Sequence, residues 1–208
     1  LNNIPILLII LFISIIFSGN IMAAPMELVF NVGANDEIAL PLYGTVNATV
    51  EWGDGNSDTY TDSGNKSHTY GSDGTYTVTI GGTLTQFGND SWGWTGSNKL
   101  TEAKSFGDVG LTSLSGAFHD ADNLTSVPAA LPSTVTDLRH LFRENDVSSV
   151  TNLSSWDVSS VTDMAAMFFD AGSFNQDITS WDVSSVTNMS NMFRDAMSFD
   201  QNLSNWTV

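Results

Sequence analysis

Apolar residues recur at a nearly fixed interval through the second half of the chain. Phenylalanines return about every 25 residues, and two rows of aliphatic residues keep the same interval. A fixed period of about 20–50 residues indicates a repeat architecture, in which one unit packs on the next. The three rows are Phe118, Phe142, Phe168 and Phe193; Leu114, Leu138, Met164 and Met189; and Leu111, Val135, Val161 and Val186.

A row of tryptophans repeats with the same period, at Trp156, Trp181 and Trp206. We therefore predict a solenoid over 106–208, built of about four units of roughly 24–26 residues each. A single unit cannot bury its own apolar side, so each should stack about one strand spacing, ~4.8 Å, from the next. A fifth unit begins at Trp206 and stops at Val208, so we expect the sequence to be truncated within its repeats.

The first half of the chain has a different pattern, an alternation of apolar and polar residues at 45–52 and again at 75–80. Period-two alternation of β-branched and aromatic residues predicts half-buried strands. Asp-Gly pairs at 54–55 and 73–74 predict tight turns between them. The predicted fold is thus mainly β with short helical turns: a small β-sandwich at 25–83, followed by the solenoid.

Two fragments of the first half match a known module. The sequence is E-W-G-D-G at 51–55 and H-T-Y-G-S-D-G-T-Y-T-V at 68–78. Together they resemble the W-G-D-G and H-x-Y motifs of PKD-type, immunoglobulin-like modules. The resemblance implies a β-sandwich in which His68 is a structural hydrogen-bonding residue.

Residues 84–105 separate the two patterns and are rich in glycine, asparagine and serine. We predict a linker that also caps the open end of the solenoid. Trp92 and Trp94 lie within it. They can cover the apolar edge of the first repeat, which we favour, or form an exposed binding platform.

The repeat itself resembles a known family. The stretch V-T-D-M-A-A-M-F-F-D-A-G-S-F-N-Q-D-I-T-S-W-D-V, at 161–183, is similar to the repeat of BspA-like leucine-rich-repeat surface proteins. The likeness spans 106–208 and implies an extracellular or cell-surface interaction protein. The chain has no cysteine, so it lacks the lipid-attachment residue of the mycoplasma lipoproteins that carry such repeats.

The N-terminus is an apolar run at 4–17, followed by small and polar residues up to Ala24. This length suits the core of a signal peptide better than a membrane span of about 20 residues. We expect residues 1–24 to hold a signal peptide with cleavage after Ala23. The mature protein would be secreted or displayed at the cell surface, with no membrane span of its own.

The charge of the chain narrows the choice of partner. Twenty-three acidic residues against 6 basic ones give a formal net charge of -17. Binding to nucleic acid or to anionic membranes needs clustered lysine and arginine, so both are excluded as expected partners. The expected partners are therefore an extracellular protein, a glycan or a second copy of the chain.

The sequence shows little that could carry catalysis. No G-x-S-x-G or phosphate-binding loop is present, and His119 and His140 have no partner at metal-ligand spacing. Asp54 and Asp58 are weak calcium candidates, since the loop lacks the ligand pattern of an EF-hand. We expect no enzyme activity and no cofactor.

Candidate contact residues lie at repeated positions: Trp156, Trp181 and Trp206, with Asp157 and Asp182 directly after the first two. Stacked tryptophans more often form core, and repeated acids more often form a solvated face. An exposed aromatic row would instead suit sugar rings, and an acidic ladder would suit calcium or a basic partner.

From these patterns we predict a secreted or cell-surface adhesion protein that presents a binding face built from repeats. One alternative is a self-associating structural or matrix component. Another is a carbohydrate-binding accessory module of an extracellular enzyme.

Overall fold

A computed structural model describes residues 23–90, 93–145, 148 and 150–207. The predicted signal peptide, apart from Ala23 and Ala24, and Trp92 lie outside these ranges. The chain is mainly β, as predicted: within the described ranges the helical elements are two short 3₁₀ turns, Ser97–Lys99 and Leu153–Ser155. No helix in this part is long and apolar enough to cross a membrane.

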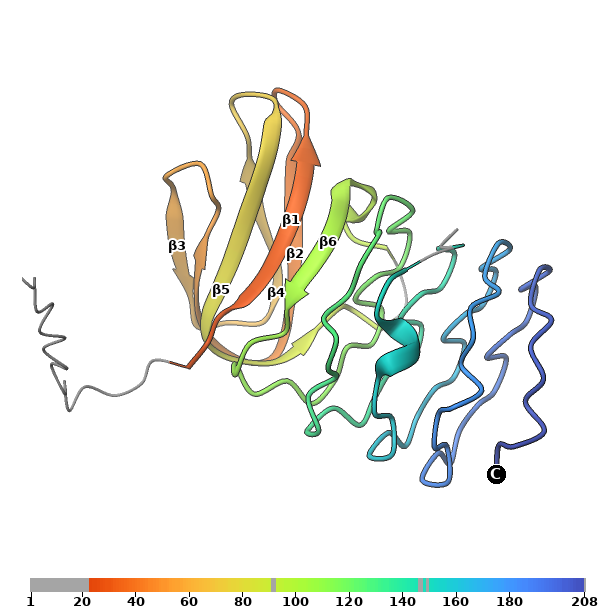
Figure 1. Ribbon diagram of the computed structural model, residues 1–208. Coiled ribbons are helices and arrows are strands. Elements are labelled where there is room, and N and C mark those ends of the chain that lie inside the picture. The colour runs from red at the N-terminus through yellow and green to blue at the C-terminus, as the bar shows by residue number, and fades with distance from the viewer. Residues whose placement is uncertain (1–22, 91–92, 146–147, 149, 208) are drawn as a thin grey trace, which may run out of the picture.

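Six strands form a single antiparallel sheet at one end of the molecule (Figure 1). Its order is β3-β2-β5-β1-β6, and β4 also pairs with β2. The strands are β1 (Met26–Val32), β2 (Glu37–Glu51), β3 (Ser57–Tyr60), β4 (Gly64–Thr69), β5 (Gly74–Phe87) and β6 (Leu100–Ser105).

The alternating residues behave as predicted. Val46, Ala48 and Val50 of β2 are buried, and the residues between them are exposed. The first Asp-Gly pair lies in the turn between β2 and β3, where Glu51 pairs with Ser57. Gly55 there has φ 94°, a left-handed conformation that glycine adopts without steric cost.

The motif residues of the first half form one aromatic cluster. The His68 ring stacks on Trp52, with centroids 4.7 Å apart, and meets Tyr70 edge to face at 4.8 Å. The Tyr70 hydroxyl donates to the Trp52 carbonyl at 3.0 Å, so the buried phenol is satisfied. Burial raises the pKa of Tyr70, which keeps the phenol protonated at any physiological pH.

The second half is a row of coils that extends from the sheet (Figure 1). Isolated parallel bridges join each coil to the next at equivalent residues, in two columns. The spacing of the bridges along the chain reproduces the period of the sequence. The first column runs Gln86, Ser113, Asp137, Asp163 and Asn188, and the second runs Glu102, Ser126 and Thr151.

Main-chain hydrogen bonds between coils extend well beyond these bridges. From Met164 to Asp170, every second amide donates to a carbonyl of the following unit, at 2.8–2.9 Å. The preceding unit donates to this one in the same way from residues 138 to 144. A buried main chain needs such partners, and here the next unit supplies them.

The phenylalanine row stacks as its period predicted. Centroids are 5.5 Å apart for Phe118–Phe142, 5.7 Å for Phe142–Phe168 and 5.7 Å for Phe168–Phe193. A second pair, Phe174–Phe199, repeats the geometry at 5.6 Å and 8°. One apolar core therefore runs from the sheet through the whole row of coils.

Residues 84–105, predicted as linker and cap, contribute more strand than expected. Residues 84–87 complete β5, and 100–105 form β6, which pairs with β1. The mixed composition of 100–105 hid this edge strand, of which only Leu100 and Ala103 are buried.

The same segment joins the sheet to the first coil. The Leu84 amide donates to Val109 O at 2.9 Å, and the Ala103 amide donates to Ser126 O at 3.0 Å. Trp94, 3% exposed, packs against Phe87 and donates from Nε1 to Ala117 O at 3.0 Å. Trp94 thus covers the core where the coils begin, and it is not an exposed platform.

Each coil carries two residues with left-handed backbone, four positions apart. Aligned residues share the conformation although their side chains differ. The first column is Gly116, His140, Ala166 and Asn191 (φ 70°, 54°, 52° and 58°), and the second is Asp120, Glu144, Asp170 and Asp195 (φ 56°, 52°, 55° and 61°). Except at glycine, this conformation costs about 1–2 kcal/mol.

Ala166 is the member of these columns with the least reason to tolerate positive φ. We expect Ala166→Gly to leave the free energy of unfolding unchanged or to raise it slightly, because the relieved strain offsets the backbone entropy of glycine. Ala165→Gly, one residue away and outside the positive-φ set, should cost about 0.5–1 kcal/mol. Urea unfolding of both variants measures the contrast, and an equal loss in the two would contradict the left-handed assignment.

Candidate functional site

The tryptophan row predicted as a possible contact surface lies in the core. Trp156 and Trp181 are each 3% exposed, and Trp206 is partly buried. Trp156 donates from Nε1 to Pro128 O at 2.8 Å, and Trp206 does the same to Ile178 O at 3.3 Å. The interpretation of this row as an exposed platform for sugar rings is therefore wrong for Trp156 and Trp181, whose side chains are buried. For Trp206, which is partly buried, it stays a prediction.

Asp157 and Asp182, in contrast, lie on the surface. Each accepts the amide of the residue two positions on, Ser159 or Ser184, at 3.0 Å. Hydrogen bonds from Ser159 hold the pKa of Asp157 below its usual value, and Ser184 does the same for Asp182. Both carboxylates stabilise turns, and their outer faces remain open to solvent.

The two weak calcium candidates have other partners. Asp54 accepts the Asn56 amide at 3.0 Å and contacts His68 Nε2 at 2.7 Å, while Asp58 accepts Trp52 Nε1 at 2.9 Å. Burial acts to raise the pKa of Asp54, but the bonds from His68 and Asn56 outweigh it and the pKa is lowered. Both acids thus hold the aromatic cluster in place.

The most regular exposed surface runs along the first column of bridges. We call it the threonine face; in each coil an exposed threonine is followed by a serine, aspartate or asparagine that is partly or fully buried. Its members are Thr112, Ser113, Thr136, Asp137, Thr162, Asp163, Thr187 and Asn188.

Hydrogen bonds along the threonine face fix its side chains. The hydroxyl of Thr162 donates to Thr136 O at 3.2 Å, and that of Thr187 donates to Thr162 O at 3.1 Å. Asn188 Nδ2 donates to Asp163 Oδ2 at 3.1 Å. These bonds hold the exposed threonines at regular intervals along the face.

Arg139 crosses the threonine face and joins three acids. Its guanidinium makes two bonds of 3.0 Å to Asp137, and it lies 3.6 Å from Asp90 and 3.9 Å from Asp163. Burial acts to raise the pKa of Asp137, but hydrogen bonds from Arg139 and from Ser113 outweigh it and lower the pKa. One cation thus offsets the repulsion between stacked carboxylates.

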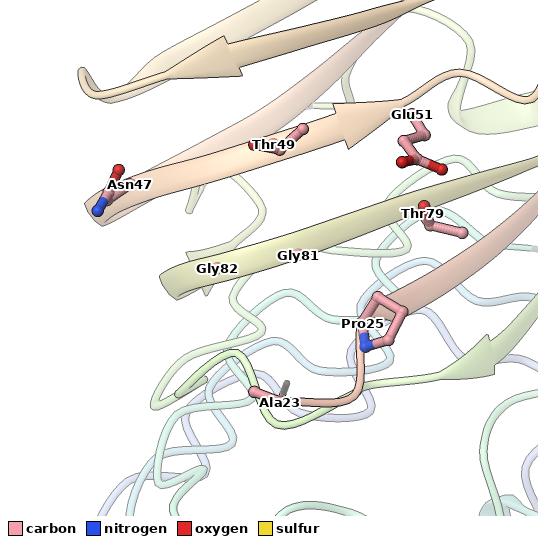
Figure 2. Close-up of a pocket in the computed structure, with 8 residues that line it drawn as sticks. All are labelled: Ala23, Pro25, Asn47, Thr49, Glu51, Thr79, Gly81 and Gly82. Carbon is pink, nitrogen blue, oxygen red and sulfur yellow. The ribbon is translucent and has the colours of Figure 1, made fainter. Parts of the chain in front are cut away.

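A shallow hollow of about 680 Å³ lies on the face of the sheet near the start of β1 (Figure 2). Alternate residues of β2 (Asn47, Thr49 and Glu51) share this face, as expected from the period of a strand. Gly81 and Gly82 of β5 leave its floor without side chains (Figure 2). Glu51 is the one charged group in its lining, and the other polar side chains there belong to Asn47, Thr49 and Thr79.

One group of metal-ligating side chains is present within the described residues: His119, Asp120 and Glu144. Sequence reasoning missed a partner for His119, because the three residues do not follow a ligand spacing along the chain. The signal that could have found it is the period, since Asp120 and Glu144 occupy equivalent places in consecutive units.

Comparison with known proteins concerns the coils alone. Residues 112–208 match a family model described as "Mycoplasma protein of unknown function, DUF285". The coils are similar to that family. No curated protein and no solved structure matches the chain.

The Asp137–Arg139 pair predicts that the free energy of unfolding falls as the solution becomes acidic. The pKa of Asp137 is lower in the folded chain than its unfolded value of about 3.9, so the stabilisation is complete above pH ~4 and is lost as the pH falls through the folded pKa. Asp137→Asn should cost about 1–2 kcal/mol at pH 7, and progressively less as the pH falls below ~4.

Thermal unfolding between pH 2.5 and 7 measures this effect. The control is Arg139→Gln, in whose background Asp137→Asn should cost less, because the charged donor is gone. A loss that is independent of both pH and Arg139 would contradict the proposed pairing.

Proposed function

We propose that the protein is a secreted or cell-surface binding protein, and that its coils form a leucine-rich-repeat-like solenoid of the BspA-like type. The threonine face is the observation that carries the proposal. It repeats one exposed surface pattern at each coil, and repeated contacts along a stiff support let many weak interactions sum.

The sheet is proposed to be a PKD-like module that carries and caps the solenoid. The stacking of His68 on Trp52 and the hydrogen bond from Tyr70 to Trp52 O support this, since they give the W-G-D-G and H-x-Y motifs a shared structural role. Strands β5 and β6 bridge to the coils at Gln86–Ser113 and Glu102–Ser126. The proposed module and solenoid would therefore act as one continuous scaffold.

The polar groups of the coils favour binding over catalysis. The hydroxyls of Thr162 and Thr187 donate to main-chain carbonyls, and the Asp163 carboxylate accepts from the Asn188 side-chain amide. Side chains fixed in this way suit a recognition surface. The net charge of -17 favours a protein or glycan partner over nucleic acid. The proposed signal peptide at 1–24 would bring the chain to such partners.

A binding screen with matched variants tests the proposal. The purified protein is applied to a panel of extracellular-matrix proteins and to an immobilised glycan array. Thr162→Arg with Thr187→Arg should weaken capture about tenfold or more, because two bulky cations interrupt the face.

The matched control is Thr59→Arg with Thr83→Arg, at two exposed threonines of the sheet. It should bind as the unchanged protein does. Equal capture of both variants, or no capture of the unchanged protein, would refute the threonine face as the binding surface.

A further inference from the structure

His119 is the most unusual polar side chain of the coils. Its side chain is 2% exposed, and Nδ1 has no hydrogen-bond partner. The aligned residues in later coils are Arg143, Phe169 and Arg194, all of them more exposed. A buried imidazole without its hydrogen bonds is costly, so its position needs an explanation.

The other ring nitrogen of this imidazole, Nε2, faces two carboxylates. His119 Nε2 lies 3.7 Å from Asp120 Oδ2 and 3.7 Å from Glu144 Oε2, too far for a hydrogen bond to either. One ligand atom from each of the three residues lies within 4.8 Å of the other two. Three ligand atoms thus surround a common point, with no proton shared between them at hydrogen-bond distance.

The repeat brings these residues together. Asp120 and Glu144 occupy the same left-handed position in consecutive coils, with φ 56° and 52°. The Asp120 amide donates to Arg143 O at 3.2 Å, which fixes the register of the two acids. The site is therefore held by the main chain of two coils and not by a mobile loop.

Neighbouring charges orient the site. The guanidinium of Arg143 contacts Glu144 Oε1 at 2.9 Å, so that Oε2 is the oxygen turned toward His119. A residue that orients a ligand in this way is usual around bound metals. Beyond the three ligands, a hollow of about 470 Å³ is lined by acids that include Asp122 and Asp170.

Two titration effects agree with this geometry. Burial lowers the pKa of His119, which favours the neutral imidazole that a metal requires. Burial and the nearby Glu144 carboxylate raise the pKa of Asp120, against the opposing effect of His119. A dication between the two carboxylates would remove their repulsion.

We propose that His119 Nε2, Asp120 Oδ2 and Glu144 Oε2 form a divalent transition-metal site suited to Zn²⁺. Metal–ligand bonds of about 2.0–2.1 Å in a tetrahedral site place ligand atoms roughly 3.3–3.4 Å apart, close to the 3.7 Å of the two histidine–carboxylate distances. Ca²⁺ fits less well, because it takes six to eight oxygen ligands and no imidazole. The fourth position faces the acidic hollow and is open to water or to a group of a partner.

Metal titration of tag-free, EDTA-treated protein tests the proposal. Zn²⁺ should bind at one per chain by calorimetry and raise the melting temperature, and Co²⁺ should give the visible absorption of a tetrahedral site. Glu144→Gln and Asp120→Asn should each weaken Zn²⁺ binding by more than the about 10–100-fold that loss of an outer-shell residue causes. His119→Ala should abolish it.

Asp195→Asn is the matched control, since Asp195 has the same place in its coil but has Arg194 before it instead of a histidine. It should bind Zn²⁺ as the unchanged protein does. Because His119 is buried and its loss can unfold the coil, the two carboxylate variants, checked by circular dichroism, decide the result. Zn²⁺ binding that survives in both, no Zn²⁺ binding in the unchanged protein, or a preference for Ca²⁺ would each overturn the site.

Discussion

The coils depend on hydrogen bonds between the main chains of consecutive units. The amides of Met164, Ala166, Phe168 and Asp170 all donate to the unit that follows, and the unit before them repeats the pattern. Because these bonds fix the register, each side chain lies beside its equivalent from the next unit. The stacked phenylalanines, the threonine face and the column of acids are all consequences of this one constraint.

The period of the sequence was enough to predict much of this half of the chain. Rows of large apolar residues that recur once per unit have to meet in the core, and Phe142 and Phe168 do so with their rings 1° from parallel. The left-handed positions could not be predicted, because Ala166 and Glu144 give no local signal for positive φ. Strand β6 was missed for a similar reason: an edge strand with two buried residues leaves little alternation to detect.

The candidate metal ligands could not be predicted from nearness in the sequence either. Asp54 and Asp58 lie close in sequence but serve as acceptors for His68 and Trp52, whereas His119 and Glu144 belong to different units and meet in space. In a repeated chain, neighbours one period away are as near as neighbours along the strand. In such proteins, acids and histidines one period apart in the sequence are therefore the ones that can form a site together.

The most direct test of the central constraint is cysteine cross-linking, because the chain has no cysteine of its own. Thr162 and Thr187 are exposed, and the Thr187 amide donates to Thr162 O at 2.8 Å. Thr162→Cys with Thr187→Cys should form a disulfide readily under mild oxidation, since stacked units bring the two Cα atoms within the usual ~4.4–6.8 Å. Thr136→Cys with Thr187→Cys spans two units, about 9–10 Å, and should not. Equal cross-linking of the two pairs, or none in the first, would contradict the stacking of one unit on the next.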